Sequence, residues 1–262
     1  MRHVRTLCGV LFAVVVLSTL AARPSEARTS HAAKKPCAAN LAACGDQGCG
    51  TDFDPNLNKL KNISTLDGTP TSMTLTSMMS LEDPVAFTKG GSRDDLAKIG
   101  EGKPVVVVAY LLIAKPELGG ESCNCGLQTA PETDNHLVLV NKNTLLKFPV
   151  QVDQTDGAAK EDLATFHSRE PESLTAEFTP RVRLQHPNYT AEKVKPLIDA
   201  ADQEALLVRV TGQLLFDSEH FLGHHLVRVN NWEVHPVFKL EYCPSGACTA
   251  ASNDGWKSLD DL

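Results

Sequence analysis

The sequence predicts a mainly β protein, built as a small closed or partly open barrel with one short helix and an irregular N-terminal extension. Three observations lead to this fold class. Segments of strand length, rich in Val and Leu, recur between residues 104 and 242. Only one later segment has clear helical spacing, and residues 28–70 show little periodicity of either kind. Aromatic side chains make up only 5% of the chain, so Val and Leu must supply the core.

The N-terminus has the order of a secretory signal peptide. Arg2 and Arg5 precede an apolar run over residues 7–20, and small and polar residues follow as far as Ala27. We expect cleavage after Ala27 and a secreted or periplasmic mature chain. The apolar run is shorter than the ~20 residues that span a bilayer, so stable membrane insertion is not expected. A retained N-terminal anchor is the alternative.

The mature chain is acidic, which bears on its partners. Removal of the signal peptide takes away three basic residues and one acidic residue, so the formal charge moves from −7 to −9. Nucleic-acid binding depends on neutralising phosphates, and an acidic protein repels them at long range. A small ligand, a glycan or a protein is therefore expected as the partner, and nucleic acid is not.

The mature chain divides into three expected parts. Residues 28–70 form a cysteine-containing irregular extension, residues 71–245 the β domain, and residues 246–262 a C-terminal tail. Near the start of the β domain, apolar and polar residues alternate weakly over residues 71–81, and we expect a strand there. Asp94 to Lys98 are expected to form one short helical turn.

The first strong strand signals lie in the middle of the chain. Val105 to Ala114 is a continuous apolar run with many β-branched residues, which predicts a strand buried on both faces. His136 to Val140 is the second expected strand, and Leu145 to Val152 is the third. Pro149 places that third strand at an edge or a bulge, because proline cannot donate a backbone hydrogen bond.

A helix is predicted after a further extended stretch at residues 174–184. Thr190 is a suitable N-cap for it. Apolar side chains then repeat at helical spacing, at Val194, Leu197, Ile198 and Ala201. Pro196 conflicts with a long helix that begins at Thr190, so the helix either kinks at Pro196 or begins there.

Two long strands complete the predicted domain. Residues 205–216 form the clearest strand, in which Gly212 marks a bulge or a barrel bend. Residues 232–242 form the last one. The order of three strands, a helix, a long bent strand and a final strand is that of an OB-fold-like barrel. The extended stretch at residues 174–184 is an insertion that this pattern leaves unexplained.

Several short motifs also resemble a family of uncharacterised exported bacterial proteins with an OB-fold-like barrel. The resemblance covers most of the chain from Cys44 to Tyr242, and its motifs are specific as a set and weak individually. They are Cys44–Cys49, Glu121–Cys125, Asp134–Leu139, Thr179–Arg181 with His186, Val210–Gly212, Phe216–His220 and Trp232–Pro236. The resemblance implies the barrel fold and carries no activity with it.

Cysteines are expected to form disulfides in an exported protein. Cys243 and Cys248 are the most favoured pair, because Pro244 and Gly246 supply the turn that a short bridge needs. Seven cysteines remain after cleavage, so one thiol is left free or pairs with another chain. The alternative is a zinc site from Cys37, Cys44, Cys49, Cys123 and Cys125, although their spacing is not that of a zinc finger.

Two similar motifs supply the candidate metal ligands, Asp134-Asn-His136 and Glu233-Val-His235. Residues i and i+2 of a strand face the same side, so each motif can present a carboxylate and an imidazole together. If the two strands are neighbours, four nitrogen and oxygen donors converge, which suits zinc or another divalent metal. The alternative is a set of hydrogen-bonded polar residues at the mouth of a barrel.

Four further residues are candidates for catalysis: Glu177, Arg181, Asp217 and His220. The carboxylates and the imidazole could join the metal ligands, and Arg181 could hold an anionic group of a substrate. A metal with an open coordination position would make bound water nucleophilic and favour hydrolysis. For Asp217 and His220 the alternative is a turn, because Asp-Ser-Glu is favourable turn sequence.

Two functions of different classes follow. The first is an exported non-catalytic binding or scaffold module for a small ligand, a glycan or a protein partner, by analogy with OB-type barrels that bind through one face and its loops. The second is a metal-dependent hydrolase, such as a phosphodiesterase, that uses the paired motifs and Arg181. The chain contains no G-x-S-x-G elbow, Walker loop, dinucleotide fingerprint or H-E-x-x-H motif.

Overall fold

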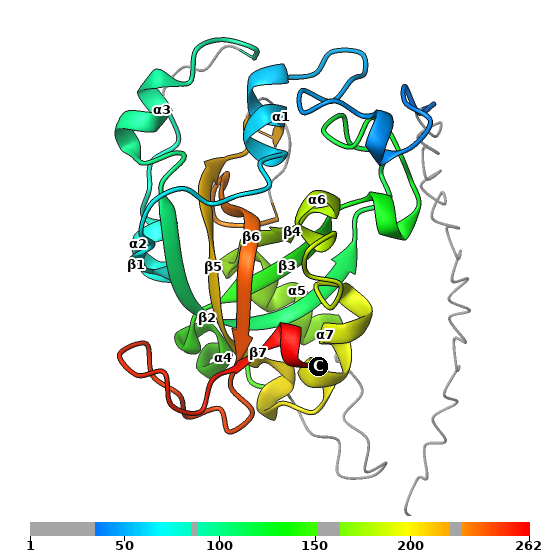
Figure 1. Cartoon of the computed structure of the whole chain (residues 1–262). Coiled ribbons are helices and arrows are strands. Elements are labelled where there is room, and N and C mark those ends of the chain that lie inside the picture. The colour runs from blue at the N-terminus through cyan, green and yellow to red at the C-terminus, as the bar shows by residue number, and fades with distance from the viewer. Residues whose placement is uncertain (1–34, 85–88, 151–162, 221–226) are drawn as a thin grey trace, which may run out of the picture. The chain divides into compact units, whose positions relative to one another are not determined.

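The computed structural model describes residues 35–84, 89–150, 163–220 and 227–262. The predicted signal peptide and its cleavage site lie outside these residues. The described chain is mainly β and contains a closed five-stranded barrel with short helices around it (Figure 1). The barrel strands are β2 (Pro104–Pro116), β3 (Asn135–Val140), β4 (Leu174–Phe178), β5 (Leu206–Phe216) and β6 (Trp232–Tyr242).

The barrel closes because β2 pairs with strands on both of its edges. Around the barrel the strand order is β2-β3-β4-β6-β5, and β5 returns to pair with β2. The β4–β6 pairing is parallel, and the other four pairings are antiparallel. Helix α7 (Ala191–Asp199) connects the third barrel strand to the fourth, as expected for an OB-fold-like barrel. The predicted fold class is therefore confirmed.

Strand β2 is long enough to take three neighbours. Its residues Val105–Val108 pair in parallel with the short strand β1 (Thr71–Thr74), and residues 110–116 pair with β3 beyond that point. Burial alternates along the first half of β2, with every second side chain turned into the barrel. The prediction that this strand is buried on both faces is therefore wrong, because its outer face is only half covered.

The third barrel strand is the largest departure from the sequence prediction. Residues 142–147 form helix α4 (Lys142–Lys147) instead of the start of a strand, and residues 151 and 152 lie outside the described part. Leu145 is buried whereas Leu146 is 70% exposed, so this apolar run does not fill a sheet. Strand β4, from the stretch expected to be an insertion, takes the third place in the barrel.

Helix α7 begins where the sequence predicts. The Thr190 side chain accepts a hydrogen bond from the Lys193 amide, and Val194 and Ile198 turn into the core. Pro196 lies inside the helix, so a helix that begins at Pro196 is wrong. The helix tolerates this proline at the loss of one backbone hydrogen bond, because only three residues follow it before the helix ends.

The bend expected at Gly212 is present in β5. The β5–β6 register shifts on both sides of Gly212, as it does at a bulge. A Cβ atom at this position would lie 2.4 Å from the Pro236 carbonyl oxygen and 2.5 Å from Val234 Cγ1. Only glycine therefore fits where β5 and β6 approach each other.

Short helices are more numerous than the single helix predicted. Those not yet given are α1 (Pro55–Lys61), α2 (Leu75–Met79), α3 (Asp94–Ile99), α5 (Leu163–Arg169) and α6 (Pro180–Arg183). Residues 71–81 are thus a strand followed by a helix, and the stretch at 174–184 is extended only as far as Phe178. The turn expected at 94–98 is α3. Figure 1 shows α1 and α3 at one end of the barrel and α4 at the other.

The barrel interior is apolar over most of its length. Its largest fully buried side chains are Phe178, Tyr189, Phe216 and Trp232, which pack against the Val and Leu residues of the five strands. At the C-terminus, β7 (Lys257–Ser258) pairs with β6, and Leu259 is buried in the same core. Among the described residues, no helix is long and apolar enough to cross a membrane.

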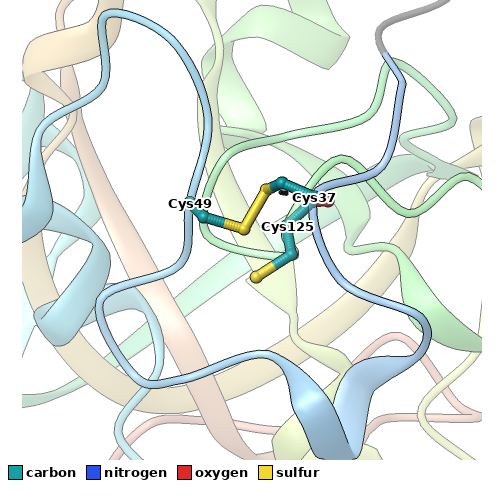
Figure 2. A group of neighbouring side chains, drawn as sticks. All are labelled: Cys37, Cys49 and Cys125. Carbon is teal, nitrogen blue, oxygen red and sulfur yellow. Dashed lines mark hydrogen bonds between the residues drawn. A yellow bond between two sulfur atoms is a disulfide. The ribbon is translucent and has the colours of Figure 1, made fainter.

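Three disulfides tie the described chain together: Cys37–Cys49, Cys44–Cys125 and Cys243–Cys248. The last is the pair that the sequence favours. Figure 2 shows Cys125 beside the Cys37–Cys49 bridge. Four of the five cysteines in the alternative zinc site are thus disulfide-bonded and cannot act as thiolate ligands. The bridges indicate an oxidising, non-cytoplasmic environment.

Candidate metal centre

The two Asp/Glu-x-His motifs converge on the outer face of the barrel wall, on either side of β4, because the alternate residues Leu137, Ala176 and Val234 fill the core. Strand β4 pairs with β3 on one edge, where Glu177 lies opposite His136, and with β6 on the other. Glu177 therefore stands between the two motifs. Its Oε1 lies 2.9 Å from His136 Nε2, and its Oε2 lies 3.3 Å from His235 Nδ1.

Asp134 joins Glu177 and His235 in a buried group of three residues. Asp134 Oδ2, just before β3, lies 3.7 Å from His235 Nε2. Asp134, Glu177 and His235 are all at most 1% exposed and each offers one donor atom within 4.8 Å of the other two. We call these three residues the inner triad. From the sequence, the two motifs were expected to meet only if their strands are neighbours. The structure brings Asp134 and His235 together, with Glu177 in the place expected for Glu233.

Ion pairs extend the inner triad along this outer face, toward α1 and the end of β5. Arg228 contacts Glu233 and Asp217, each at 3.2 Å, and Lys61 lies 3.8 Å from both Asp217 and Glu121. With the free thiol of Cys123, these residues form what we call the barrel cluster. It comprises Lys61, Glu121, Cys123, Asp134, His136, Glu177, Asp217, Arg228, Glu233 and His235.

Glu233 acts on the inner triad through His235. Its Oε1 lies 3.1 Å from His235 Nδ1, and Arg228 donates a hydrogen bond to its other oxygen. In the neutral ring, a hydrogen bond from Nδ1–H to Glu233 would leave the Nε2 lone pair of His235 facing Asp134. Ligating histidines are commonly oriented in this way, by a carboxylate on the other ring nitrogen. Burial acts to lower the pKa of His235, but Glu177 and Glu233 raise it, so without a bound cation the protonated ring is favoured.

Two donor atoms of the inner triad have no hydrogen-bond partner among the described residues. They are His235 Nε2 and Glu177 Oε2, both shielded from solvent. Buried polar atoms are nearly always hydrogen-bonded, because leaving one unpaired costs about 1–3 kcal/mol. Glu177 Oε2 is within ion-pair distance of His235 Nδ1, so His235 Nε2 is the atom of the triad that is left to bind a further group.

The pKa shifts follow from burial and from charge crowding. Burial acts to lower the pKa of His136, but the Glu177 carboxylate outweighs it and raises that pKa to about 10. For Glu177, burial acts to raise the pKa, and His136 and His235 bring it below its ordinary value. Burial and the Glu121 carboxylate together raise the pKa of Asp134 well above its ordinary value. Glu177 is thus ionised at neutral pH, whereas Asp134 resists ionisation.

Carboxylates outnumber fixed positive charges in the barrel cluster. It holds five of them, at positions 121, 134, 177, 217 and 233, against two permanent cations, Lys61 and Arg228. Unpaired charge in a protein interior is costly and is met by protonation, by pairing or by a bound cation. Because His136 is protonated at neutral pH and Asp134 resists ionisation, the charges of the cluster are close to balanced, and a bound cation would take the place of a proton.

Solvent reaches the cluster on the side of β3. Glu121, His136 and Glu177 form a second group of three donors within 4.8 Å of one another. The side chains of His136 and Glu121 are 20% and 21% exposed, whereas those of the inner triad are not. Because Glu177 belongs to both groups, this outer group connects the inner triad to solvent.

The remaining predicted residues lie around the cluster in other roles. Arg181 donates hydrogen bonds to the backbone carbonyls of Cys44 and Gly45, at 2.7 and 3.1 Å, so it holds the N-terminal extension in place. His220 lies 2.5 Å from Asp217, and this hydrogen bond raises the pKa of His220. Asp217 thus joins the cluster, whereas Arg181 is not among its contacts.

Sequence reasoning missed three members of the cluster, Lys61, Glu121 and Arg228, and considered Cys123 only in the alternative zinc site with other cysteines. Glu121 and Cys123 are two residues apart and come shortly before Asp134, which is the only signal that could have indicated them. Lys61 ends α1, a helix in the extension that was expected to be irregular. No local pattern marks Lys61 or Arg228.

A surface hollow of about 680 Å³ lies away from the cluster and shares no residue with it. Its walls include Tyr110, Leu145, Leu146, Leu207 and Tyr242. The volume of a surface hollow is therefore no guide to the position of the charged cluster in this protein.

Comparison with known proteins finds no matching family model, no similar curated protein and no similar solved structure. The resemblance to exported bacterial proteins accordingly stays an expectation. What can be inferred about function rests on the geometry of the barrel cluster.

Proposed function

We propose that this chain is an exported binding module that holds a divalent metal cation, such as zinc, in a buried site on the outer face of its barrel. One observation carries the proposal: His235 Nε2 is fully buried, has no hydrogen-bond partner among the described residues, and faces a carboxylate. Export is supported by the signal-like N-terminus and by the disulfides.

The donor set suits a transition-metal ion. A cation bound by His235 Nε2, Asp134 and Glu177 would have one nitrogen and two oxygen ligands, a combination that zinc accepts. Four ligands at about 2.0 Å from a tetrahedral zinc lie about 3.3 Å apart. The 3.7 Å between His235 Nε2 and Asp134 Oδ2 therefore needs only a small contraction.

A binding role is favoured over hydrolysis by access to the triad. A catalytic metal keeps a coordination position open to substrate, whereas the inner triad is enclosed. Arg181, the group expected to hold an anionic substrate, is committed to backbone carbonyls. The partly exposed outer group gives a small ion a route to Glu177. Hydrolysis at that outer group is the alternative function.

Metal content separates a real site from a network of ion pairs. We would compare the wild type with His235→Gln and with a matched control, His186→Gln, which removes a histidine paired with Asp260 outside the cluster. After chelation and reloading with zinc, elemental analysis should find about one ion per wild-type and control chain, and none in His235→Gln. Circular dichroism verifies that all three are folded.

Two results would count against this proposal. A folded wild type that retains no zinc contradicts a cation site, and equal zinc in His235→Gln contradicts the assigned ligand. A phosphoester screen on the loaded wild type tests the alternative. Turnover that His235→Gln abolishes and His186→Gln retains would favour the hydrolase.

A further inference from the structure

Two disulfides of the N-terminal part lie side by side. They are the Cys37–Cys49 and Cys44–Cys125 bridges. The sulfur atoms of Cys37, Cys49 and Cys125 all lie within 4.8 Å of one another (Figure 2). Thiol–disulfide exchange proceeds by attack of a thiolate on a disulfide sulfur, so it needs this kind of proximity. The two bridges are therefore placed to exchange partners.

The two bridges differ in their access to solvent. Cys37 is exposed and Cys49 is half-buried. Cys44 and Cys125, by contrast, are only 3% and 1% exposed. A small thiol in solution can therefore attack the first bridge at Cys37, whereas the second bridge is shielded from direct attack.

Backbone hydrogen bonds hold the exposed bridge against the loop of Cys125. The Cys37 amide donates a hydrogen bond to the Cys125 carbonyl at 2.9 Å, and the Cys49 amide donates one to the Ser122 carbonyl at 3.0 Å. These contacts do not depend on the bond between Cys37 and Cys49. A thiolate released at Cys49 would therefore stay beside Cys125 and act on it as an intramolecular group.

A fixed positive charge lies beside Cys44, the other half of the buried bridge. Arg181 donates hydrogen bonds to the carbonyls of Cys44 and Gly45, at 2.7 and 3.1 Å. Its Nε has no hydrogen-bond partner among the described residues. A disulfide breaks faster when the leaving thiol has a low pKa, and a neighbouring cation lowers the pKa of a thiol. Cys44 is therefore the favoured leaving group.

We propose that these two bridges form a thiol–disulfide exchange site for a small thiol of the glutathione class. The thiolate of the small molecule attacks Cys37 Sγ, forms a mixed disulfide with it and releases Cys49 as a thiolate. Cys49 then attacks Cys125 Sγ, forms a Cys49–Cys125 bond and releases Cys44, which takes up a proton from water. The numbers of disulfide bonds and of free thiols are unchanged. This inference is independent of the proposed cation site.

Treatment of the folded, disulfide-intact protein with glutathione tests the proposal. Thiols would be trapped with N-ethylmaleimide at successive times, and linked peptides identified by mass spectrometry. The wild type should yield a peptide that joins Cys49 to Cys125. Glutathione should be found on Cys37, and the label on Cys44.

The double variant Cys37→Ala/Cys49→Ala removes the exposed bridge. Labelling of Cys44 should then slow roughly tenfold or more, because the buried bridge has lost its intramolecular attacker. The Cys243–Cys248 bridge is the internal control, because among the described residues it belongs to no such sulfur group. It should be reduced at the same rate in both proteins.

Two bridges with a purely structural role would give the opposite result. Loss of the Cys37–Cys49 bridge would then loosen the extension, so that the buried bridge would open and be reduced faster. Labelling of Cys44 that is unchanged or faster in the double variant therefore overturns the proposal. The absence of the Cys49–Cys125 peptide from the wild type overturns it as well. If the double variant fails to fold, the wild-type peptides decide alone.

Discussion

Replacing Cys44 and Cys125 together by Ala would remove the bridge that ties the N-terminal extension to the loop of Cys123. This bridge closes a loop of 81 residues, whereas Cys243–Cys248 closes one of five. In the chain-entropy model the cost of losing a bridge grows with the logarithm of loop length. We calculate about 4.5 kcal/mol of unfolding free energy for Cys44–Cys125 and about 2 kcal/mol for Cys243–Cys248.

Urea unfolding of the two double variants and the wild type measures this difference. The proteins should be compared in the presence of a chelator, because a bound ion would add its own stabilisation to the wild type. We expect the Cys44/Cys125 variant to lose more than twice as much stability as the Cys243/Cys248 variant. Its zinc affinity should also fall when the chelator is removed, because the loop holding Cys123 is released.

Equal losses from the two bridges would refute the chain-entropy reasoning. A smaller loss from the long bridge would refute it more strongly, because native strain or residual structure in the unfolded chain would then dominate. An unchanged zinc affinity in the Cys44/Cys125 variant would show that the extension does not position the cluster.

Three further predictions follow from single contacts. Glu233→Gln removes the charged acceptor on His235 and should weaken zinc binding by about 10–100-fold in a competition titration; an unchanged affinity would rule out this role. Burial acts to raise the pKa of Glu241, but hydrogen bonds, with Arg209 first, lower it, so its stabilisation is present above pH ~4.5 and is lost as the pH falls. The stability difference between wild type and Glu241→Gln, measured in urea at each pH, should therefore shrink below that pH, and a constant difference would contradict the pairing. Gly212→Ala forces β5 and β6 apart and should cost about 1–3 kcal/mol by thermal unfolding; an unchanged melting temperature would mean that the bulge relaxes freely.

Four of the five barrel strands could be located from the sequence, because each is a run of β-branched and apolar residues bounded by turn residues. Strand β6 begins and ends at the predicted residues, Trp232 and Tyr242. The fifth, β4, lies within the stretch predicted to be extended at residues 174–184, but that stretch was interpreted as an insertion and not as a barrel strand. The run at 145–152 was predicted to be the third barrel strand instead, because a short apolar run can form either a helix or a strand.

The candidate site was predictable only in part, for a related reason. Alternation along a strand places Asp134 with His136 and Glu233 with His235, which needs no knowledge of neighbours. That Glu177 joins the two pairs depends on β4 lying between β3 and β6. Such a parallel pairing between distant segments leaves no local pattern, and neither does the approach of Lys61 from α1.

The pairing of the N-terminal cysteines has a consequence for how the protein matures. The Cys37–Cys49 and Cys44–Cys125 bridges interleave along the chain. A chain that enters an oxidising compartment from its N-terminus exposes Cys37, Cys44 and Cys49 well before Cys125. Oxidation in order of arrival would join Cys44 to a near neighbour, and exchange must then break that bond. We expect this protein to depend on a disulfide isomerase, without which reshuffling would take minutes to hours.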